Sequence, residues 1–358
     1  MKILHVITSL MTGGAEHLVV QLVNYLRLQG HESDVCVFNG EQTDFMRELK
    51  NSGCRIWRLG HSYYNPIYIL RLSRIIRNYD IVHTHNSSPQ LFGALAAIGW
   101  RGCLITTEHN TDNRKRHMLF VRGLDRWMYG RYSHIICISE QTKRRLQCYL
   151  GDNWLCRYGR GRLITIANGV DVARFGNAQS YIERDGKNIV VMVAAFRPQK
   201  DHVTLLRAIA MLPVDFRLWL VGDGETRGQI EQQIDNLGLQ GRVRMFGNRI
   251  DVPEILKSAD IIVMSSNWEG FGLAAVEGMA AGKPVIASDV DGLRQIVEGY
   301  GLVFRRGDDA QLADYIKQLV ANPDVYQEIA QRCKLRAEEY DIRNMMNGYM
   351  EVYNSIVK

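Results

Sequence analysis

The sequence lacks any long apolar run, any closely paired cysteines and any GxGxxG element, and each absence argues against a class of protein. No apolar stretch reaches the roughly 18 to 20 residues that a membrane-spanning helix requires. The seven cysteines are scattered without CxxC spacing and their number is odd, which argues against a disulfide framework and favours reduced thiols. Because no GxGxxG element follows a predicted strand, a dehydrogenase is not supported. The amino-terminal segment has no small-residue cleavage site, so we interpret it as a first strand and not as a signal peptide.

What the sequence does contain is typical of a globular protein with two domains. Its 358 residues exceed what one hydrophobic core usually supports. Hydrophobic residues make up 46% and charged residues 23%, which is ordinary for a folded protein and unlike a disordered one.

The net charge of +6 is unevenly distributed along the chain. Residues 1–175 hold 23 Lys and Arg against 13 Asp and Glu, a net charge of +10, whereas residues 176–358 hold 21 against 25, a net charge of −4. A basic first half suggests an anionic partner there: phospholipid, a lipid-linked pyrophosphate or nucleic acid. We expect no nucleic-acid partner, because the arginines belong to no recognisable nucleic-acid-binding motif.

Short β-branched runs alternate with longer helical patterns, which predicts an α/β fold with parallel sheets. The predicted strands of the first half are residues 3–8, 32–38, 55–59, 81–85, 104–107, 134–138 and 163–166. Those of the second half are residues 189–194, 216–221, 243–247, 261–265, 284–288 and 301–304.

These strands predict two Rossmann-like, doubly wound domains. We assign residues 1–170 to the first domain and residues 189–339 to the second. Residues 171–188, rich in turn signals, are the predicted linker, and residues 340–358 are a predicted helix that returns to the first domain. Doubly wound domains bind ligands at the carboxyl ends of their strands, so we expect the active site in a cleft between the two domains.

The most informative segment is residues 265–292, SSNWEGFGLAAVEGMAAGKPVIASDVDG. After a strand, Glu269 and a glycine-containing turn lead into a helix that carries Glu277. Glycines allow close backbone approach, and the start of the helix offers unpaired N–H groups and a positive dipole end, which suits a diphosphate. Each carboxylate could accept hydrogen bonds from sugar or ribose hydroxyls. The alternative is that Glu269 caps the helix and Glu277 is a solvated surface residue.

This segment resembles the E-x7-E signature of the GT-B fold, family 4 glycosyltransferases. Further motifs resemble that family in the expected order: GGAE at residues 13–16, NGVD at 168–171, PQKD at 198–201, VGDGE at 221–225, FGN at 246–248 and GKPVIASD at 282–289. The resemblance covers the chain from the first strand to about residue 305. It implies a GT-B fold and a retaining transferase that uses a nucleotide-sugar donor, with UDP favoured. In such a transferase, residues 1–170 would bind the acceptor and residues 189–339 the nucleotide sugar. It also implies a glycan or lipid-pyrophosphate acceptor, a role in bacterial surface polysaccharide synthesis, and neither a cofactor nor a metal.

The resemblance also assigns donor-binding residues. Glu269 corresponds to the residue that contacts the donor sugar, Glu277 to the one that binds the ribose hydroxyls, and Lys200 to the phosphate-binding lysine. For Lys200 the alternative is a surface lysine at a helix start. The remaining donor-binding assignments are Gly14, Arg197, Asn248, Gly270, Phe271, Gly272 and Leu273, the last three through their backbone N–H groups.

One position departs from the family pattern. The family arginine aligns with Ala195, whereas the arginine of this chain is Arg197, two residues later. Arg197 would therefore approach the phosphates from a different backbone position than the family arginine does.

Histidines mark the predicted strand ends of the first half. His109 resembles the family histidine near the reactive carbon of the donor sugar, so we expect His109, Glu269 and Lys200 to be catalytic; the alternative for His109 is a packed or surface histidine. His83 and His85 alternate along one strand and face the same side. Their spacing could suit a metal, but no third ligand is evident, so we favour a structural role or a polar contact from His85 in the cleft.

Two weaker signals complete the predicted sites. Gly13 and Gly14 lie at a strand–helix junction that suits close approach to phosphate or acceptor, or an ordinary tight turn. Asp289-Val290-Asp291 looks like a DxD metal motif, but it lies inside the GT-B stretch, so we expect no metal and activity in excess chelator.

Residues 114–131 predict a basic amphipathic helix with six Lys or Arg and one acidic residue. Its apolar positions are Val121, Leu124, Trp127 and Met128. Such a helix could rest on an anionic membrane, which predicts a cytoplasmic enzyme held peripherally on the inner face of the plasma membrane; alternatively its apolar face packs on the domain core. The membrane or acceptor candidates are Gly13, His85, Arg114, Lys115, Arg116, Arg122, Arg126 and Trp127.

Two other functions compete with transfer. An epimerase or hydrolase on the same scaffold is one, although the E-x7-E context argues against it. A non-catalytic protein that binds nucleotide sugars is the other, because a fold does not dictate a function.

Overall fold

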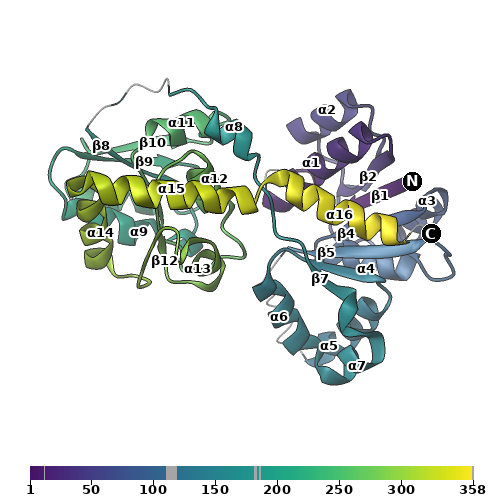
Figure 1. Ribbon diagram of the computed structural model, residues 1–358. Coiled ribbons are helices and arrows are strands. Elements are labelled where there is room, and N and C mark those ends of the chain that lie inside the picture. Colours follow the sequence, from purple (N-terminus) through teal and green to yellow (C-terminus); the bar gives the residue numbers. More distant parts are fainter. Residues whose placement is uncertain (12, 110–118, 181–183, 185–186, 357–358) are drawn as a thin grey trace. The chain divides into compact units, whose positions relative to one another are not determined.

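The computed structural model describes residues 1–11, 13–109, 119–180, 184 and 187–356. The chain divides into two compact units, of which unit 1 comprises Met1–Ala167 with Met345–Lys358 and unit 2 comprises Asn168–Asn344 (Figure 1). Each unit is built on its own parallel sheet, as the alternating pattern predicted.

The sheet of unit 1 has seven strands among the described residues, in the order β3-β2-β1-β4-β5-β6-β7. They are β1 (Lys2–Ile7), β2 (Glu32–Asn39), β3 (Ile56–Gly60), β4 (Ile81–His85), β5 (Cys103–Glu108), β6 (His134–Cys137) and β7 (Leu163–Thr165). The intervening helices are α1 (Gly14–Leu28), α2 (Asp44–Asn51), α3 (Ile67–Ile75), α4 (Ser87–Ala96), α5 (Leu119–Gly130), α6 (Glu140–Leu150) and α7 (Asp152–Tyr158).

Side chains that alternate along these strands form two separate cores, one on each face of the sheet. On β1, Leu4 and Val6 belong to the core that also contains residues of α3, α4, α5 and α6. Ile7 belongs to the other core, with residues of α1 and α2. Burial on both faces explains why a strand such as β1 is mostly apolar rather than half polar.

The carboxyl-terminal helix α16 (Ile342–Ile356) packs on unit 1 (Figure 1). Tyr349 and Tyr353 are fully buried. The hydroxyl of Tyr353 lies 2.7 Å from Nδ1 of His83, and the hydroxyl of Tyr349 lies 3.3 Å from Oγ1 of Thr107. Burying one large side chain contributes about 1.5 to 3 kcal/mol, so these two tyrosines help to hold the helix on the sheet.

The sheet of unit 2 has six strands among the described residues, in the order β10-β9-β8-β11-β12-β13. They are β8 (Asn188–Val193), β9 (Phe216–Val221), β10 (Val243–Gly247), β11 (Ile261–Met264), β12 (Val285–Ser288) and β13 (Leu302–Phe304). The helices are α8 (Val172–Gly176), α9 (His202–Ala210), α10 (Arg227–Asn236), α11 (Val252–Ser258), α12 (Leu273–Ala280), α13 (Asp291–Val297), α14 (Asp309–Ala321) and α15 (Pro323–Glu339), with a 3-10 turn, η4, at Pro198–Lys200.

The predicted linker, residues 171–188, needs correction. Within it the structure forms α8, which packs on α11 and α12 of unit 2. Lys257 ties its end down by donating to the carbonyl of Gly176 at 3.0 Å. The chain instead passes between the units at two neighbouring segments that pair within unit 2, where Val170 donates to the carbonyl of Tyr340 at 2.9 Å and accepts from Ile342 at 2.8 Å. The final helix accordingly begins at Ile342 and not at residue 340.

Candidate functional site

The loops that follow β8 and β9 meet at the carboxyl edge of the unit 2 sheet. The amide of Phe196 donates to the carbonyl of Asp223 at 3.0 Å. This approach requires glycine in the second loop: a Cβ at Gly222 would lie 2.1 Å from the carbonyl oxygen of Ala194, and a Cβ at Gly224 would lie 2.4 Å from that of Phe196. The VGDGE motif therefore sets the position of the loop that leads to Lys200.

A second set of hydrogen bonds fixes that loop to the end of β11. The hydroxyl of Ser265 donates to the carbonyl of Asp201 at 2.9 Å, and the amide of Asn267 donates to the carbonyl of Gln199 at 2.7 Å. Asp201 takes a left-handed φ of +47° and caps α9 by accepting from the amide of Thr204 at 3.3 Å. The PQKD motif thus forms a rigid corner between β8 and α9.

Lys200 and Glu269, which are 69 positions apart in the chain, form an ion pair at this corner. The side chains are only 18% and 8% exposed, respectively. The hydroxyl of Ser266 donates to Oε1 of Glu269 at 2.9 Å, and Ser266 is held in turn by Ser288, which donates to its carbonyl at 2.6 Å. Two of the predicted catalytic residues are therefore in direct contact.

The glycine-containing turn after Glu269 leads directly into α12. Gly272 precedes the helix with a φ of +102°, a conformation that strongly favours glycine. Phe271 is buried, with its ring edge-on to that of Tyr340 at 5.3 Å. The first N–H groups of a helix have no partner within the helix, so the turn offers hydrogen-bond donors and a positive dipole end beside Glu269.

Glu277 lies one turn into α12 and is partly buried, not a solvated surface residue. Burial raises the pKa of its carboxyl to about 7, and the positive charge of Arg174 on α8 opposes that rise. Among the residues that the structure describes, none donates a hydrogen bond to this carboxyl. Its oxygens are thus available to hydroxyl donors of a ligand.

Two other predicted donor residues are not brought into this contact. Arg197 is exposed at the start of η4, and Asn248 is exposed after β10. The amide of Arg197 donates to the carbonyl of Ala195 at 2.9 Å, which turns the chain between the family position and the arginine of this sequence.

In unit 1, His109 follows β5 directly and is partly buried. Its Nε2 lies 3.1 Å from Nδ1 of His85 at the end of β4. Nε2 of His85 lies 3.2 Å from Nδ1 of His5, a residue of β1. Burial lowers the pKa of His109 to about 4 and that of His5 to about 3, so both imidazoles are neutral at pH 7.

His5 is the third histidine of a cluster in which the sequence showed only His83 and His85. Register pairs His5 with His83, and alternation along β4 puts His85 on the same face. Ligand atoms of the three lie within 4.8 Å of one another, a spacing that a metal could use. Yet both nitrogens of His83 are already bonded, to Tyr353 at 2.7 Å and to Thr107 at 2.8 Å, and both of His85 are bonded to other histidines.

Gly13 and Gly14 lie where β1 joins α1, with Gly13 as the residue before the helix. A Cβ at Gly13 would lie 2.3 Å from the carboxylate of Glu16, which folds back over the junction. Burial raises the pKa of that carboxyl. The Glu16 carboxylate thus occupies the space beside residue 13 in this structure.

The chain matches two families along almost its whole length: Glycosyltransferase Family 4 over residues 12–174 and Glycosyl transferases group 1 over residues 175–339. It is 36% identical over 340 residues to the lipopolysaccharide core biosynthesis glycosyltransferase LpsD of Rhizobium meliloti, an alignment that covers 92% of this chain and 91% of the relative. The chain belongs to the family 4 glycosyltransferases.

This glycosyltransferase is also 26% identical over 325 residues to the UDP-Gal:alpha-D-GlcNAc-diphosphoundecaprenol alpha-1,3-galactosyltransferase of Escherichia coli, with 83% of this chain and 81% of the relative covered. Among solved structures, Anabaena Alr3699/HepE in complex with UDP matches with a TM-score of 0.87 at 23% identity, covering 99% of this chain and 100% of that one. The predicted GT-B fold is confirmed.

The basic helix of the glycosyltransferase is α5, and its predicted residues 114–116 (Arg114, Lys115 and Arg116) lie outside the described residues. The Nε atoms of Arg122 and Arg126 are already bonded within unit 1, because they donate to the carbonyls of Tyr149 and Leu150 at 3.1 and 2.8 Å. These carbonyls lie at the end of α6, where a positive charge also stabilises the helix dipole. Trp127 remains 38% exposed.

No helix in the described part of the glycosyltransferase combines the length and the apolar character that crossing a membrane would require. Asp289 of the DxD-like motif pairs through both carboxylate oxygens with Arg294. That carboxylate is therefore already neutralised by a group of the chain itself.

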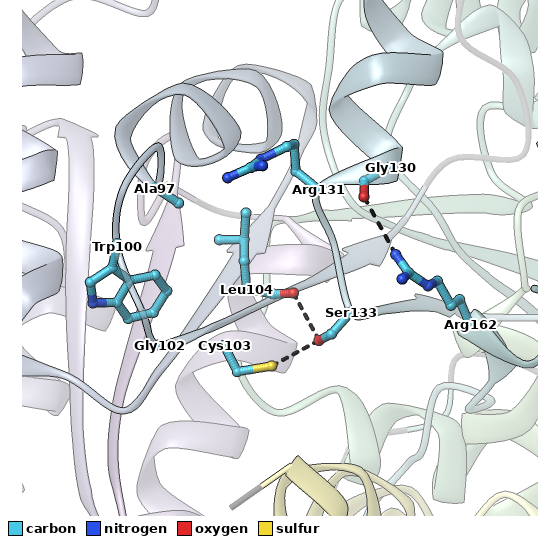
Figure 2. Close-up of a pocket in the computed structure, with 9 residues that line it drawn as sticks. All are labelled: Ala97, Trp100, Gly102, Cys103, Leu104, Gly130, Arg131, Ser133 and Arg162. Atoms are coloured by element: carbon cyan, nitrogen blue, oxygen red, sulfur yellow. Dashed lines mark hydrogen bonds between the residues drawn. The ribbon is translucent and has the colours of Figure 1, made fainter. Parts of the chain in front are cut away.

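A cavity of about 270 Å³ lies at the other end of the unit 1 sheet, where β5 and β6 begin (Figure 2). Trp100 forms one wall, and the thiol of Cys103 contacts the hydroxyl of Ser133 at 2.9 Å. Arg162 is held by the carbonyls of Gly130 and Tyr132. None of the predicted site residues lines this cavity.

Sequence reasoning missed His5 and Gly292 of the glycosyltransferase. His5 lies inside an apolar strand and carries no local signal; only the register of β1 with β4 places it beside His83. A Cβ at Gly292 would lie 2.4 Å from the carbonyl oxygen of Glu269. The DVDG sequence could have indicated such a close approach, because glycine at the start of a helix often permits one.

Proposed function

We propose that this protein is a retaining glycosyltransferase that moves a hexose or an N-acetylhexosamine from a UDP-sugar to a glycan or lipid-pyrophosphate acceptor. The setting would be bacterial surface polysaccharide synthesis. One observation carries the proposal: the Lys200–Glu269 ion pair lies beside the turn that starts α12, with Glu277 one turn further along. A cation, helix N–H groups and two carboxylates suit a diphosphate, a sugar and a ribose, respectively.

Transfer of the sugar requires groups that stabilise negative charge on the leaving nucleotide diphosphate. When the bond between the sugar C1 and the β-phosphate oxygen breaks, its electron pair stays on the nucleotide diphosphate. Lys200, Arg197 and the N–H groups of Phe271, Gly272 and Leu273 would stabilise that charge without moving a proton. Glu269 would hold the sugar hydroxyls and Glu277 the ribose hydroxyls.

Retention would follow from substitution on one face of the sugar. The acceptor oxygen bonds to C1 on the side from which the phosphate leaves, and the departing phosphate accepts the acceptor's proton. This route requires no pair of catalytic carboxylates like that of glycosidases. His109 would contact the donor sugar near its reactive carbon.

The relatives support the choice of donor and acceptor. The Escherichia coli relative is named for UDP-Gal and a diphosphoundecaprenol acceptor, and the Anabaena structure contains UDP. LpsD is named for lipopolysaccharide core biosynthesis. A cytoplasmic enzyme, peripheral on the inner face of the plasma membrane, would meet such an acceptor.

Release of UDP tests the function. The full-length protein is incubated with UDP-glucose, UDP-galactose or UDP-N-acetylglucosamine, each with and without a bacterial glycolipid extract as acceptor. We expect release that depends on the acceptor, and a product whose anomeric configuration by NMR matches that of the donor. Acceptor-independent release would indicate a hydrolase, donor interconversion without release an epimerase, and binding without turnover a non-catalytic protein; each would overturn the proposal.

We further propose that α5 rests on an anionic membrane through Trp127 and Leu124, which are 38% and 46% exposed. Sedimentation with vesicles of phosphatidylcholine, with and without phosphatidylglycerol, is the test. Because residues 1–175 carry a net charge of +10, we expect binding only with the anionic lipid, and weaker binding for Trp127→Ala. Leu335→Ala, at an exposed apolar position of α15, is the matched control. Equal sedimentation with and without phosphatidylglycerol, or no effect of Trp127→Ala, would contradict the proposal.

A further inference from the structure

Three imidazoles of unit 1 form a hydrogen-bonded row that ends at His109. His5 contacts His85 through Nδ1 and Nε2 at 3.2 Å, and His85 contacts His109 through Nδ1 and Nε2 at 3.1 Å. His83 lies beside this row, with its ring centroid 4.1 Å from that of His85, but its two nitrogens are bonded to hydroxyls. The row therefore has two ends: Nε2 of His5 and Nδ1 of His109.

The protons of this row can be arranged in only two ways. Burial lowers the pKa of all three members, so each ring is neutral near pH 7 and carries one proton. Each contact between two nitrogens then needs one N–H donor and one bare acceptor. If His5 donates from Nδ1, His85 donates from Nδ1 and His109 keeps its proton on Nδ1; if the row runs the other way, all three protons are on Nε2.

The inner end of the row distinguishes the two arrangements. His5 is fully buried, and its Nε2 has no hydrogen-bond partner among the described residues. In the first arrangement this atom is a bare acceptor, and in the second it is an N–H group without an acceptor. Unpaired buried N–H groups are rarer in proteins than incompletely satisfied acceptors, which favours the first arrangement.

We propose that His5 and His85 are positioning residues that fix the tautomer of His109, so that its Nδ1 carries the proton and donates to an oxygen of the donor substrate. The nitrogen that a histidine presents to a ligand is set by the hydrogen bond that its other nitrogen makes. His85 makes that bond by donating from Nδ1 to Nε2 of His109. His5 donates to Nε2 of His85, which keeps the proton of His85 on Nδ1. Among the described residues, none bonds to Nδ1 of His109, so none of them competes with a ligand for this N–H. The role in catalysis rests on the function proposed above, whereas the tautomer does not.

Nitrogen-15 NMR of histidine-labelled full-length protein tests the tautomer without a substrate. Loss of signals in His109→Gln assigns the His109 resonances. We expect Nδ1 of His109 to be protonated in the wild type. In His5→Phe, which removes the inner donor, we expect a mixture of the Nδ1-protonated and Nε2-protonated tautomers. The control is His83→Phe, a substitution in the same cluster but outside the row, which should keep the wild-type tautomer.

Kinetics provide the second measurement. His85→Phe, which severs the row next to His109, should lower kcat/KM for the donor about five- to tenfold, the value of one lost hydrogen bond. His83→Phe should lower kcat/KM much less, even if its melting temperature falls as far as that of His85→Phe.

A wild-type His109 protonated at Nε2, or the same tautomer in His5→Phe as in the wild type, would overturn the inference. If His5→Phe does not fold, the wild-type tautomer alone decides. If His109 is protonated at Nδ1 but the protein has no transferase activity, the inferred tautomer stands and the proposed function is wrong.

Discussion

If Glu277 binds the donor as proposed, its raised pKa predicts how donor affinity changes with pH. Burial raises this pKa to about 7 in the protein without ligand. If ribose hydroxyls donate to the carboxylate, only the ionised form binds the donor well. The fraction ionised is about nine-tenths at pH 8 and about one-tenth at pH 6 for a pKa near 7, so UDP affinity should fall about tenfold over that interval.

Calorimetric titration with UDP at pH 6, 7 and 8 measures this effect, and Glu277→Gln supplies the reference. UDP has a phosphate group that itself titrates near pH 6, but that contribution is common to both proteins and cancels in the ratio of their dissociation constants. We expect the wild type to lose about tenfold more affinity than Glu277→Gln between pH 8 and pH 6. Parallel curves for the two proteins would refute the role of Glu277 in binding the ribose.

Three further predictions follow from the contacts. Lys200→Ala should lower kcat about 10²- to 10³-fold in the UDP-release assay, because a fixed charge at the leaving group is lost; near-normal turnover would exclude that role. Gly292→Ala should raise KM for the donor and lower the melting temperature, because the new Cβ would meet the backbone of Glu269, whereas Gly228→Ala on α10, where a Cβ meets nothing within 4 Å, should do neither. The pKa of His5 is lowered in the folded state from its ordinary value of 6.5 to about 3, so its stabilising effect is present above pH 6.5 and is lost as pH falls below it. Between pH 7 and pH 5 the wild type should therefore lose about 2 kcal/mol more unfolding free energy in urea than His5→Phe, and equal losses would contradict the neutral buried imidazole.

The fold was predictable because its signals are local and repeated. Each predicted strand is present among the described residues, with ends that differ by at most one residue, since β-branched runs between helical patterns define buried parallel strands. The linker was not predictable in this way. Its turn residues looked irregular, but α8 buries Phe175 and packs against helices that come about 80 to 100 residues later in the chain. Only tertiary packing makes that segment part of unit 2.

The candidate site likewise has residues that local motifs predicted and residues that only tertiary contacts reveal. Motif resemblance pointed to Lys200 and Glu269, and the structure brings them into contact. The sequence could not show that Arg122 and Arg126 donate to carbonyls at the end of α6. A basic amphipathic pattern is the same whether its arginines face a membrane or neighbouring carbonyls. Nor could the sequence reveal His5, whose partners lie about 80 residues away.

The ion pair between Lys200 and Glu269 implies a physical constraint on donor binding. Both side chains are largely buried, and a buried charge left without a partner costs several kcal/mol, so breaking this contact without supplying another partner would be unfavourable. A diphosphate that approaches Lys200 competes with Glu269 for the same ammonium group. Sugar hydroxyls can then donate to the carboxylate that the lysine has partly released, and the hydroxyl of Ser266 holds that carboxylate in place during the exchange. In the proposed function the donor would therefore replace one ion pair with two contacts, a phosphate with Lys200 and sugar hydroxyls with Glu269.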